Sequence, residues 1–144
     1  MIAVDTNLLV YAHREDASWH ESAYRSIERL ATGVGSWAIP WPCVHEFLAI
    51  VTHARIYVPP TPVAAAVDQV SAWLEAPGVV LLAESEEYWP RLQALLTAGR
   101  ITGAQVHDAR VAALCLYHGV EELWTADRDF SRFPELRTRN PLID

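Results

Sequence analysis

The sequence predicts an α/β protein of one domain, in which a short central parallel sheet is flanked by helices on both faces. Short apolar runs of strand length alternate with longer segments whose apolar residues recur every three or four positions. The 144 residues are near the usual size of one domain, and no linker, repeat or low-complexity segment divides them. Strands that alternate with helices are typical of parallel sheets covered on both faces.

Four strands are expected, each from a short apolar run. The first strand is the IAV segment at the amino end, and the third is the fully apolar VVLLA segment. The tail after the fourth strand is expected to be loop-rich, with a last short apolar segment near Leu142. The predicted strands are 2–4, 36–39, 79–83 and 122–125.

Six helices are expected between and after these strands. Pro42 suits the first turn of a helix, the prolines of YVPPTP separate two helices, and Gly119 stops the last one. The predicted helices are 7–11, 18–31, 42–54, 62–75, 86–98 and 107–118.

Composition excludes several classes of protein. With 51% hydrophobic and 20% charged residues, the chain is not expected to be disordered. No apolar run reaches the roughly 20 residues that span a bilayer, and the start lacks a signal-peptide pattern, so a cytoplasmic protein without membrane contact is expected. Cys43 and Cys115 lack CxxC spacing and are expected to be buried, reduced thiols. A net charge of −7 argues against loose electrostatic binding of nucleic acid.

Four acids fall where a parallel sheet binds ligands. Asp5 and Asp127 each follow a strand, and Glu46 and Asp108 each lie near a helix start, so all are expected beyond the carboxyl ends of the strands. Each of these acids also has a simpler structural role open to it, because Asp is a good N-cap and an acid in the first turn of a helix is stabilised by the helix dipole. Asp127 and Asp129 can both face the same cleft only if the chain stays extended between them; otherwise one of them, and Asp129 in preference, is expected to cap the turn before Phe130 or to pair with Arg128.

The coincidence of four acids points to a divalent cation. Clustered carboxylates repel one another unless positive charge lies between them. A set of oxygen ligands favours Mg²⁺, with Mn²⁺ as a substitute, over zinc. Such an ion would support phosphoryl chemistry by activating water and offsetting charge on phosphate oxygens.

Four segments together resemble the PIN-domain ribonucleases, specifically the VapC-type toxins of bacterial toxin–antitoxin pairs. These are VDTNLLVYA, PCVHEFLAI, TGAQVHDARVAAL and LWTADRDFSRFPELR, in that order, and the resemblance covers essentially residues 1–144. It implies a Mg²⁺-dependent endoribonuclease that cuts single-stranded or loop RNA. It also implies a homodimer, and a cognate antitoxin whose tail occupies the active cleft.

The resemblance assigns roles to individual residues. Asp5 and Asp108 would hold the metal most directly, while Glu46 and Asp127 would complete the acidic pocket and orient water. The supporting residues that it implies, with Asn7 and Thr125 bonding the acids or the scissile phosphate, are Thr6, Asn7, Thr125 and, ranked lower, Asp129.

Several residues beside the acids are open to two interpretations. His45 and His107 precede proposed acids, but neighbours on a helix point about 100° apart, so structural or surface roles are preferred. Arg100 and Arg128 are candidates for phosphate contacts, with a salt bridge to a nearby acid as the alternative. The six tryptophans are expected in the core or a dimer interface rather than stacked on bases.

Two other functions compete with the ribonuclease. One is a phosphotransferase with Asp5 as nucleophile, as in haloacid-dehalogenase-like enzymes, but those need a second Asp where this chain has Asn7. The other is a catalytically weak PIN-like binding module that acts mainly in an antitoxin and operator complex.

Overall fold

Parallel strands form the centre of the molecule. In the computed structural model, which describes residues 1–143, they lie in the order β3-β2-β1-β4-β5. The first strand along the chain is therefore the central strand of the sheet, and its residues Ala3 and Val4 are fully buried. The strands are β1 (Ile2–Val4), β2 (Trp37–Pro40), β3 (Val79–Leu82), β4 (Glu122–Trp124) and β5 (Thr138–Arg139).

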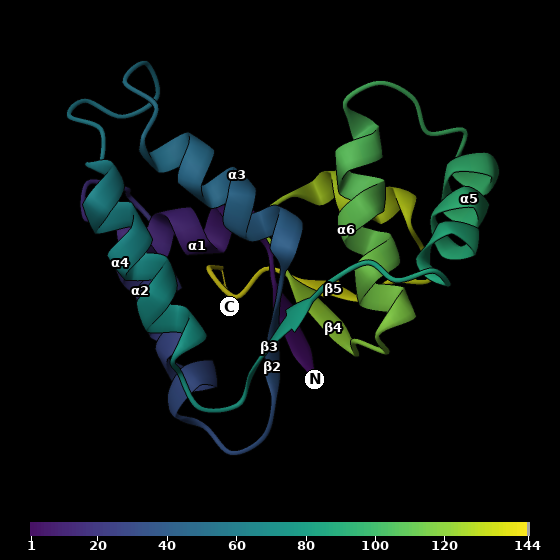
Figure 1. Cartoon of the computed structure of the whole chain (residues 1–144), viewed down its shortest axis with the longest axis horizontal. Helices are drawn as coiled ribbons and strands as arrows, with labels where there is room; N and C mark the ends of the chain where they lie inside the picture. Colours follow the sequence, from purple (N-terminus) through teal and green to yellow (C-terminus); the bar gives the residue numbers. More distant parts are fainter. Residues whose placement is uncertain (144) are drawn as a thin grey trace.

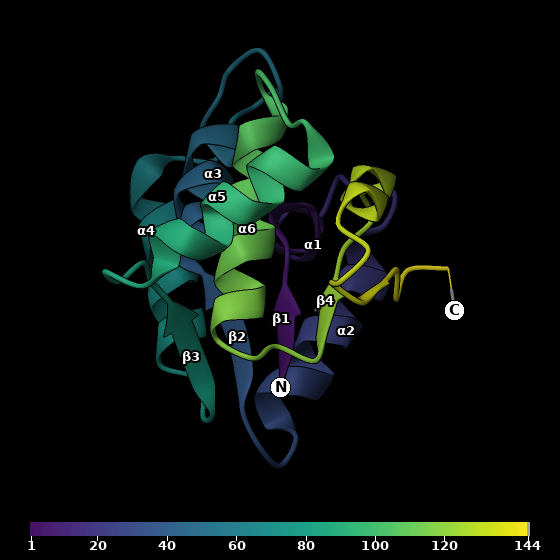
Figure 2. The same cartoon turned by 90° about the vertical axis from the view of Figure 1, so that its right-hand side faces the viewer.

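Helices cover both faces of this sheet, as predicted. Figures 1 and 2 show α1, α2 and α4 on one side, α5 and α6 on the other, and α3 above the strands between the two groups. The helices are α1 (Thr6–His13), α2 (His20–Thr32), α3 (Trp41–Val51), α4 (Val63–Leu74), α5 (Tyr88–Gly99) and α6 (Gln105–Tyr117). Pro42 lies in the first turn of α3, and Gly119, with a φ of 70°, follows the end of α6.

The tail, predicted to be loop-rich, also contains regular structure. It contains the 3₁₀ helix η1 (Arg128–Arg132) and the strand β5, in which Thr138 pairs with Leu123 and Arg139 with Trp124. Two exposed polar residues at a sheet edge have no apolar period, so nothing in their pattern indicates a strand. The wholly apolar strand β3 is also an edge strand, and Val80 is 37% exposed.

One apolar core joins the layers. Its largest fully buried side chains include Trp37 and Phe47, and the rings of Phe47 and Trp73 meet edge to face at 4.9 Å. Cys43 and Cys115 are buried free thiols, as expected. Trp19, which is 43% exposed, and Trp89, which is 56% exposed, lie outside the core, so the dimer-interface part of the expectation stays a prediction for these two.

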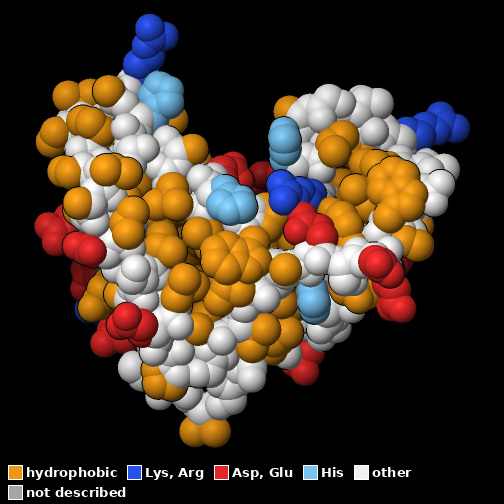
Figure 3. Space-filling model, viewed as in Figure 1, with side chains coloured by type: hydrophobic (Ala, Val, Ile, Leu, Met, Phe, Trp, Pro, Cys, Tyr) orange, Lys and Arg blue, Asp and Glu red, His pale blue; other side chains and the backbone are white. Residues whose placement is uncertain are grey.

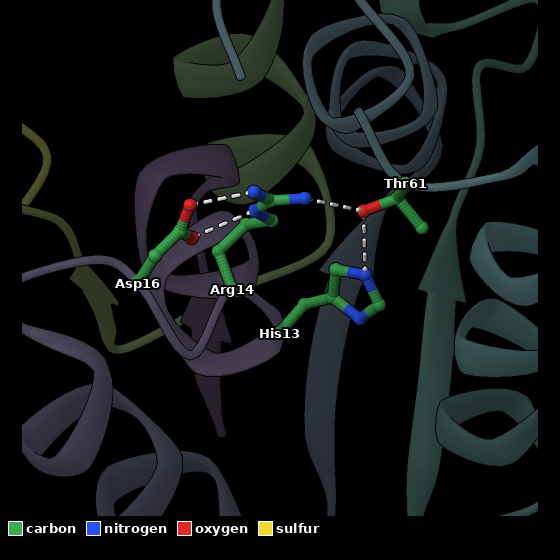
Figure 4. Close-up of polar contacts among 4 residues, drawn as sticks. All are labelled: His13, Arg14, Asp16 and Thr61. Carbon is green, nitrogen blue, oxygen red and sulfur yellow. Dashed lines mark hydrogen bonds and ion pairs between the residues drawn. The ribbon is translucent and has the colours of Figure 1, made fainter. Parts of the chain in front are cut away.

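Polar contacts fasten the end of α1 to the connection between α3 and α4 (Figure 4). His13 Nε2 and Arg14 Nη1 both lie within hydrogen-bond distance of Thr61 Oγ1, at 3.1 and 3.2 Å. Arg14 also donates to both carboxylate oxygens of Asp16 and lies over the ring of Tyr57. These contacts hold the YVPPTP segment against α1, whose first turn carries site residues.

No helix within residues 1–143 has both the length and the apolar character needed to cross a bilayer.

The packing of α3 against the sheet gives a prediction on stability. Phe47→Ala is expected to lower the free energy of unfolding by about 3 to 5 kcal/mol, because it leaves a cavity beside Trp73 and His13. Urea denaturation followed by circular dichroism measures this loss. Trp89→Ala, which removes a ring that is more than half exposed, serves as the control and is expected to cost far less. Equal losses in the two variants would contradict this description of the core.

Candidate metal and phosphodiester site

The four predicted acids all lie toward the carboxyl edge of the sheet. Asp5 directly follows β1 and Asp127 follows β4 after a short turn, while Glu46 and Asp108 lie on α3 and α6. Central parallel strands end together, so residues distant in sequence meet at this edge. The sheet order thus brings residues 5 and 127 beyond the ends of two adjacent strands, β1 and β4.

Asp5 is buried and held by several donors. Its Oδ2 accepts a hydrogen bond of 2.7 Å from the hydroxyl of Thr125 and a longer one, 3.4 Å, from the amide of Asn7. Its Oδ1 accepts from the backbone N–H of Thr6 at 2.8 Å, so Asp5 is also the N-cap of α1. The simple role as a helix cap and the predicted place in an acidic site are therefore compatible.

Burial changes the acidity of Asp5. Its pKa is raised from 3.8 to about 6, because desolvation, with a smaller contribution from the charge of Glu46, outweighs the lowering effect of the hydrogen bonds from Thr125 and Thr6. A carboxylate with 6% of its residue surface exposed is thus kept charged at neutral pH mainly by donated hydrogen bonds. A cation at this edge would stabilise the charged form.

Asn7 and Thr125 link the two central strand ends, as the resemblance implied for residues that bond the acids. The amide of Asn7 donates to Thr125 Oγ1 at 3.3 Å, and its carbonyl oxygen accepts from the N–H of Ala126 at 3.2 Å. Thr125 Oγ1 also accepts from the N–H of Asp127 at 3.0 Å. The turn that carries Asp127 is therefore fixed relative to Asp5.

Glu46 is exposed rather than enclosed by its apolar neighbours. Its Oε2 accepts a hydrogen bond of 3.0 Å from the hydroxyl of Thr6, which ties α3 to the start of α1. The charge of Glu46 contributes to raising the pKa of both Asp5 and Asp108. Glu46 therefore belongs to the same electrostatic group as the other acids.

Three carboxylates come close enough together to share one ion. One oxygen each from Asp108, Asp127 and Asp129 can be chosen so that all three lie within 4.8 Å of one another. Burial, followed by the charges of Asp127, Asp129 and Glu46, raises the pKa of Asp108, while Arg132 opposes this. Within residues 1–143, Asp5 and Glu46 are not part of this group, although the charge of Glu46 raises the pKa of Asp108.

Of the two alternatives for Asp129, the cap or ion pair with Arg128 is wrong, and a place beside Asp127 is found although the chain is not extended here. Asp127 is the N-cap of η1 and accepts from the N–H of Asp129 at 2.8 Å. The carboxylate of Asp129 instead lies 3.9 Å from Arg132 and joins Asp108 and Asp127. The turn after Asp127 is 3₁₀ and not extended, and this local conformation brings the two acids of TADRD together.

A cavity of about 590 Å³ opens beside these acids, lined by Glu46 and Asp108 with His45, His107 and Arg110 among its other walls. Figure 3 shows a notch between the α3–α4 side and the α5–α6 side of the molecule, with acidic and histidine side chains along it. Both histidines face the same cavity as the acids, although helix geometry favoured surface roles for them. The sequence did indicate this position, because each histidine directly precedes one of the predicted acids, His45 before Glu46 on α3 and His107 before Asp108 on α6.

The two predicted arginines lie in different places. Arg128 stands directly after Asp127, and no ion pair recorded among residues 1–143 includes it. Arg100 is the left-handed C-cap of α5, with a φ of 50°, and does not line the cavity that holds Glu46 and Asp108. The expected salt-bridge alternative is therefore absent for Arg128 within the described part of the chain.

The donor set fits a hard divalent cation. The ligands on offer are oxygens of three carboxylates, two of which are half-buried, and burial together with the like charges around it raises the pKa of Asp108. Oxygen-only sites suit Mg²⁺ or Mn²⁺, whereas zinc prefers nitrogen and sulfur ligands. Cys43, the nearest thiol, is fully buried behind Asp5 and has a pKa well above its usual value owing to desolvation.

The burial of Asp5 gives a prediction on pH dependence. Without divalent ions its folded pKa of about 6 lies above its unfolded value of 3.8, so the folded state binds more protons between these values. The contribution of Asp5 to stability is therefore present below pH 4 and falls as pH rises to 6, by about 3 kcal/mol in the limit.

Unfolding of the parent and of Asp5→Asn in chelator, measured from pH 4 to pH 7, isolates this effect as a difference. The parent is expected to lose stability relative to the variant as pH rises. A difference that does not change with pH would contradict the raised pKa.

Comparison with known proteins places the chain in a family. The family model described as the PIN domain matches residues 2–136. Ribonuclease VapC43 of Mycobacterium tuberculosis is 36% identical over 142 residues, which cover 99% of this chain and 96% of that protein. Ribonuclease VapC48 of the same species is 30% identical over 137 residues, covering 95% and 94%.

Solved structures agree on the fold. VapBC2 from Rickettsia felis, bound to a DNA fragment from its promoter, superposes with a TM-score of 0.70 at 21% identity and covers 97% of this chain and 98% of its own. Mycobacterium tuberculosis VapC20, a toxin that cleaves the sarcin–ricin loop, gives a TM-score of 0.67 at 18% identity, covering 91% and 93%. With its acids gathered at the carboxyl edge of a five-stranded parallel sheet, this chain belongs to the PIN domain family and, within it, to the VapC-type ribonucleases.

Proposed function

We propose that this chain, as one domain over residues 1–144, is a Mg²⁺-dependent endoribonuclease that cuts single-stranded or loop RNA. The observation that carries the proposal is the group of Asp108, Asp127 and Asp129, whose oxygens come within 4.8 Å of one another beside a cavity. The relatives at 30 to 36% identity are named ribonucleases, and this chain matches them over nearly their whole length.

The acids divide into two sets in this proposal. Asp108, Asp127 and Asp129 hold the ion directly, and Mn²⁺ is expected to substitute for Mg²⁺. When bound, the ion offsets charge on the phosphate oxygens and activates water for attack on phosphorus. Asp5, which is buried and held in place by the hydroxyl of Thr125, contributes a further negative charge near the site.

Glu46 is the exposed acid of the cavity wall, and its hydrogen bond from Thr6 fixes one of its oxygens. It is therefore placed to orient the attacking water and to accept its proton. His45 and His107, on the walls of the same cavity, offer N–H groups to RNA phosphates or bases. Together these residues form a site in which an anionic substrate is accepted by an acidic protein through a cation.

The biological role that we propose is the toxin of a VapBC-type pair, acting as a homodimer and inhibited by a cognate antitoxin. The relatives named VapC support this role. The competing role, a binding module without useful catalysis, is disfavoured by the site itself, because every acid expected for cleavage is present. A phosphotransferase that uses Asp5 as nucleophile is disfavoured by its burial.

Cleavage of RNA tests the proposal. The purified chain with Mg²⁺ is expected to cut single-stranded or loop RNA, and chelator is expected to stop it. Asp108→Asn and Asp127→Asn should each lower kcat on the order of 10²-fold or more, because loss of an ion ligand removes several kcal/mol of transition-state stabilisation. Cleavage is followed on labelled RNA by gel electrophoresis.

Asp68→Asn, an exposed acid-to-amide change on α4, is the matched control and should leave cleavage unchanged. An antitoxin encoded in the neighbouring reading frame should inhibit the parent. Folded protein that binds Mn²⁺ but cuts no RNA would refute the enzyme and favour the binding module, and full activity in Asp108→Asn would refute the assignment of the site.

A further inference from the structure

A second cavity, of about 400 Å³, adjoins the acid group at Asp127. It shares Asp127 and Thr125 with the site, whereas the larger cavity contains Glu46 and Asp108. Because an oxygen of Asp127 lies within 4.8 Å of one of Asp108, the two cavities approach each other at the acids. A chain that crosses the acids from the larger cavity therefore continues into the smaller one.

The walls of the smaller cavity differ from those of the site in charge and shape. Tyr11 of α1 and Trp19 of the α1–α2 connection provide two aromatic rings, and Arg128 and Arg139 provide two guanidinium groups. Figure 2 shows the segment after β5 beside α2, and η1 near α1. Aromatic rings and arginines from four separate segments thus surround one hollow.

The exposure of Trp19 has no explanation in the fold. Its side chain makes no capping hydrogen bond at the start of α2, where its backbone carbonyl alone accepts from the N–H of Ala23 at 3.0 Å. With 43% of its surface exposed, it adds little to the core, yet it lines this cavity. An exposed indole beside a hollow is typical of a stacking surface for a flat ligand.

Two arginines, Arg128 and Arg139, line this cavity in a chain whose net charge is −7. Arg128 forms no ion pair with any carboxylate in residues 1–143. Arg139 lies with its guanidinium 5.8 Å from the ring centre of Trp124, which positions it at the cavity wall. Guanidinium groups bind phosphate through paired N–H donors, and they also stack on bases.

We propose that this cavity binds one nucleotide of single-stranded RNA, adjacent to the phosphate held at the acids. The inference rests on the proposed ribonuclease function and adds a substrate subsite to it. The base stacks on Trp19 or Tyr11 and the flanking phosphate meets Arg128, the combination by which proteins bind unpaired nucleotides. The volume lies within the range of small-ligand sites, so it suits one nucleotide and not a duplex.

Binding of RNA without cleavage tests the subsite directly. The probes are fluorescein-labelled octauridylate and octaadenylate, and the protein is the full chain carrying Asp108→Asn, so that the probe stays intact. Fluorescence anisotropy with Mg²⁺ present gives the Kd. Trp19→Ala and Arg128→Ala are each expected to weaken binding roughly tenfold, the usual loss for one stacked base or one phosphate contact.

The controls separate this effect from general losses of charge or stability. Trp89→Ala and Arg91→Ala remove the same residue types from the exposed face of α5 and should leave the Kd unchanged. Trp19→Phe keeps a stacking ring and should restore most of the affinity. Circular dichroism confirms that each variant is folded, as expected for two exposed side chains.

The outcomes distinguish the subsite from the proposed function. If the parent cuts RNA but Trp19→Ala and Arg128→Ala bind as the α5 controls do, the subsite is wrong and the ribonuclease stands. If the parent cuts nothing but binding still depends on Trp19 and Arg128, the subsite stands and the ribonuclease is wrong. If the two variants keep RNA binding and lose binding of a cognate antitoxin, the cavity takes a peptide and the proposal is overturned.

Discussion

Repulsion among carboxylates at the carboxyl edge of the sheet is the interaction on which the rest of the site depends. Asp108 has a raised pKa because it is desolvated and faces Asp127, Asp129 and Glu46, and Asp5 has one because it is buried. The protein offsets part of this cost with donors from Thr125, Asn7 and Thr6. A divalent ion would offset much of the remainder, so ion binding and the geometry of this edge are coupled.

The hydrogen bonds around Asp5 also explain why the fold and the site depend on each other. Thr125 and Asn7 link the ends of β1 and β4, and the hydroxyl of Thr6 reaches Glu46 on α3. The same contacts that satisfy a buried carboxylate therefore hold the central strands and two helices in register. Behind them, Phe47 and Trp73 fill the space between α3 and α4. A change that loosens this packing is expected to disturb the acids as well.

Much of the fold could be predicted because its signals are local. Apolar runs and helical periods located β1 to β4 and all six helices, and the strand ends placed Asp5 and Asp127 on one edge. The strand β5 could not be found in this way, because Thr138 and Arg139 are polar and pair only through their backbone with β4. The sequence leaves the position of Asp129 open between the cleft and a cap, because it depends on the 3₁₀ turn that Asp127 caps. The exposure of Trp19 depends on the packing of distant segments, which helical periodicity does not report.

Titration of the purified chain with Mn²⁺ tests the central claim most directly. Electron paramagnetic resonance counts the bound ions, and calorimetry in buffers of different ionisation enthalpy counts the protons released. The structure predicts saturable binding that is at least tenfold weaker in Asp108→Asn and Asp127→Asn than in Asp68→Asn, with release of protons because a bound cation favours the ionised form of Asp108, whose pKa burial and like charges raise. Binding that is absent from the parent, or equal in all of these variants, would contradict a shared ion site at this edge of the sheet.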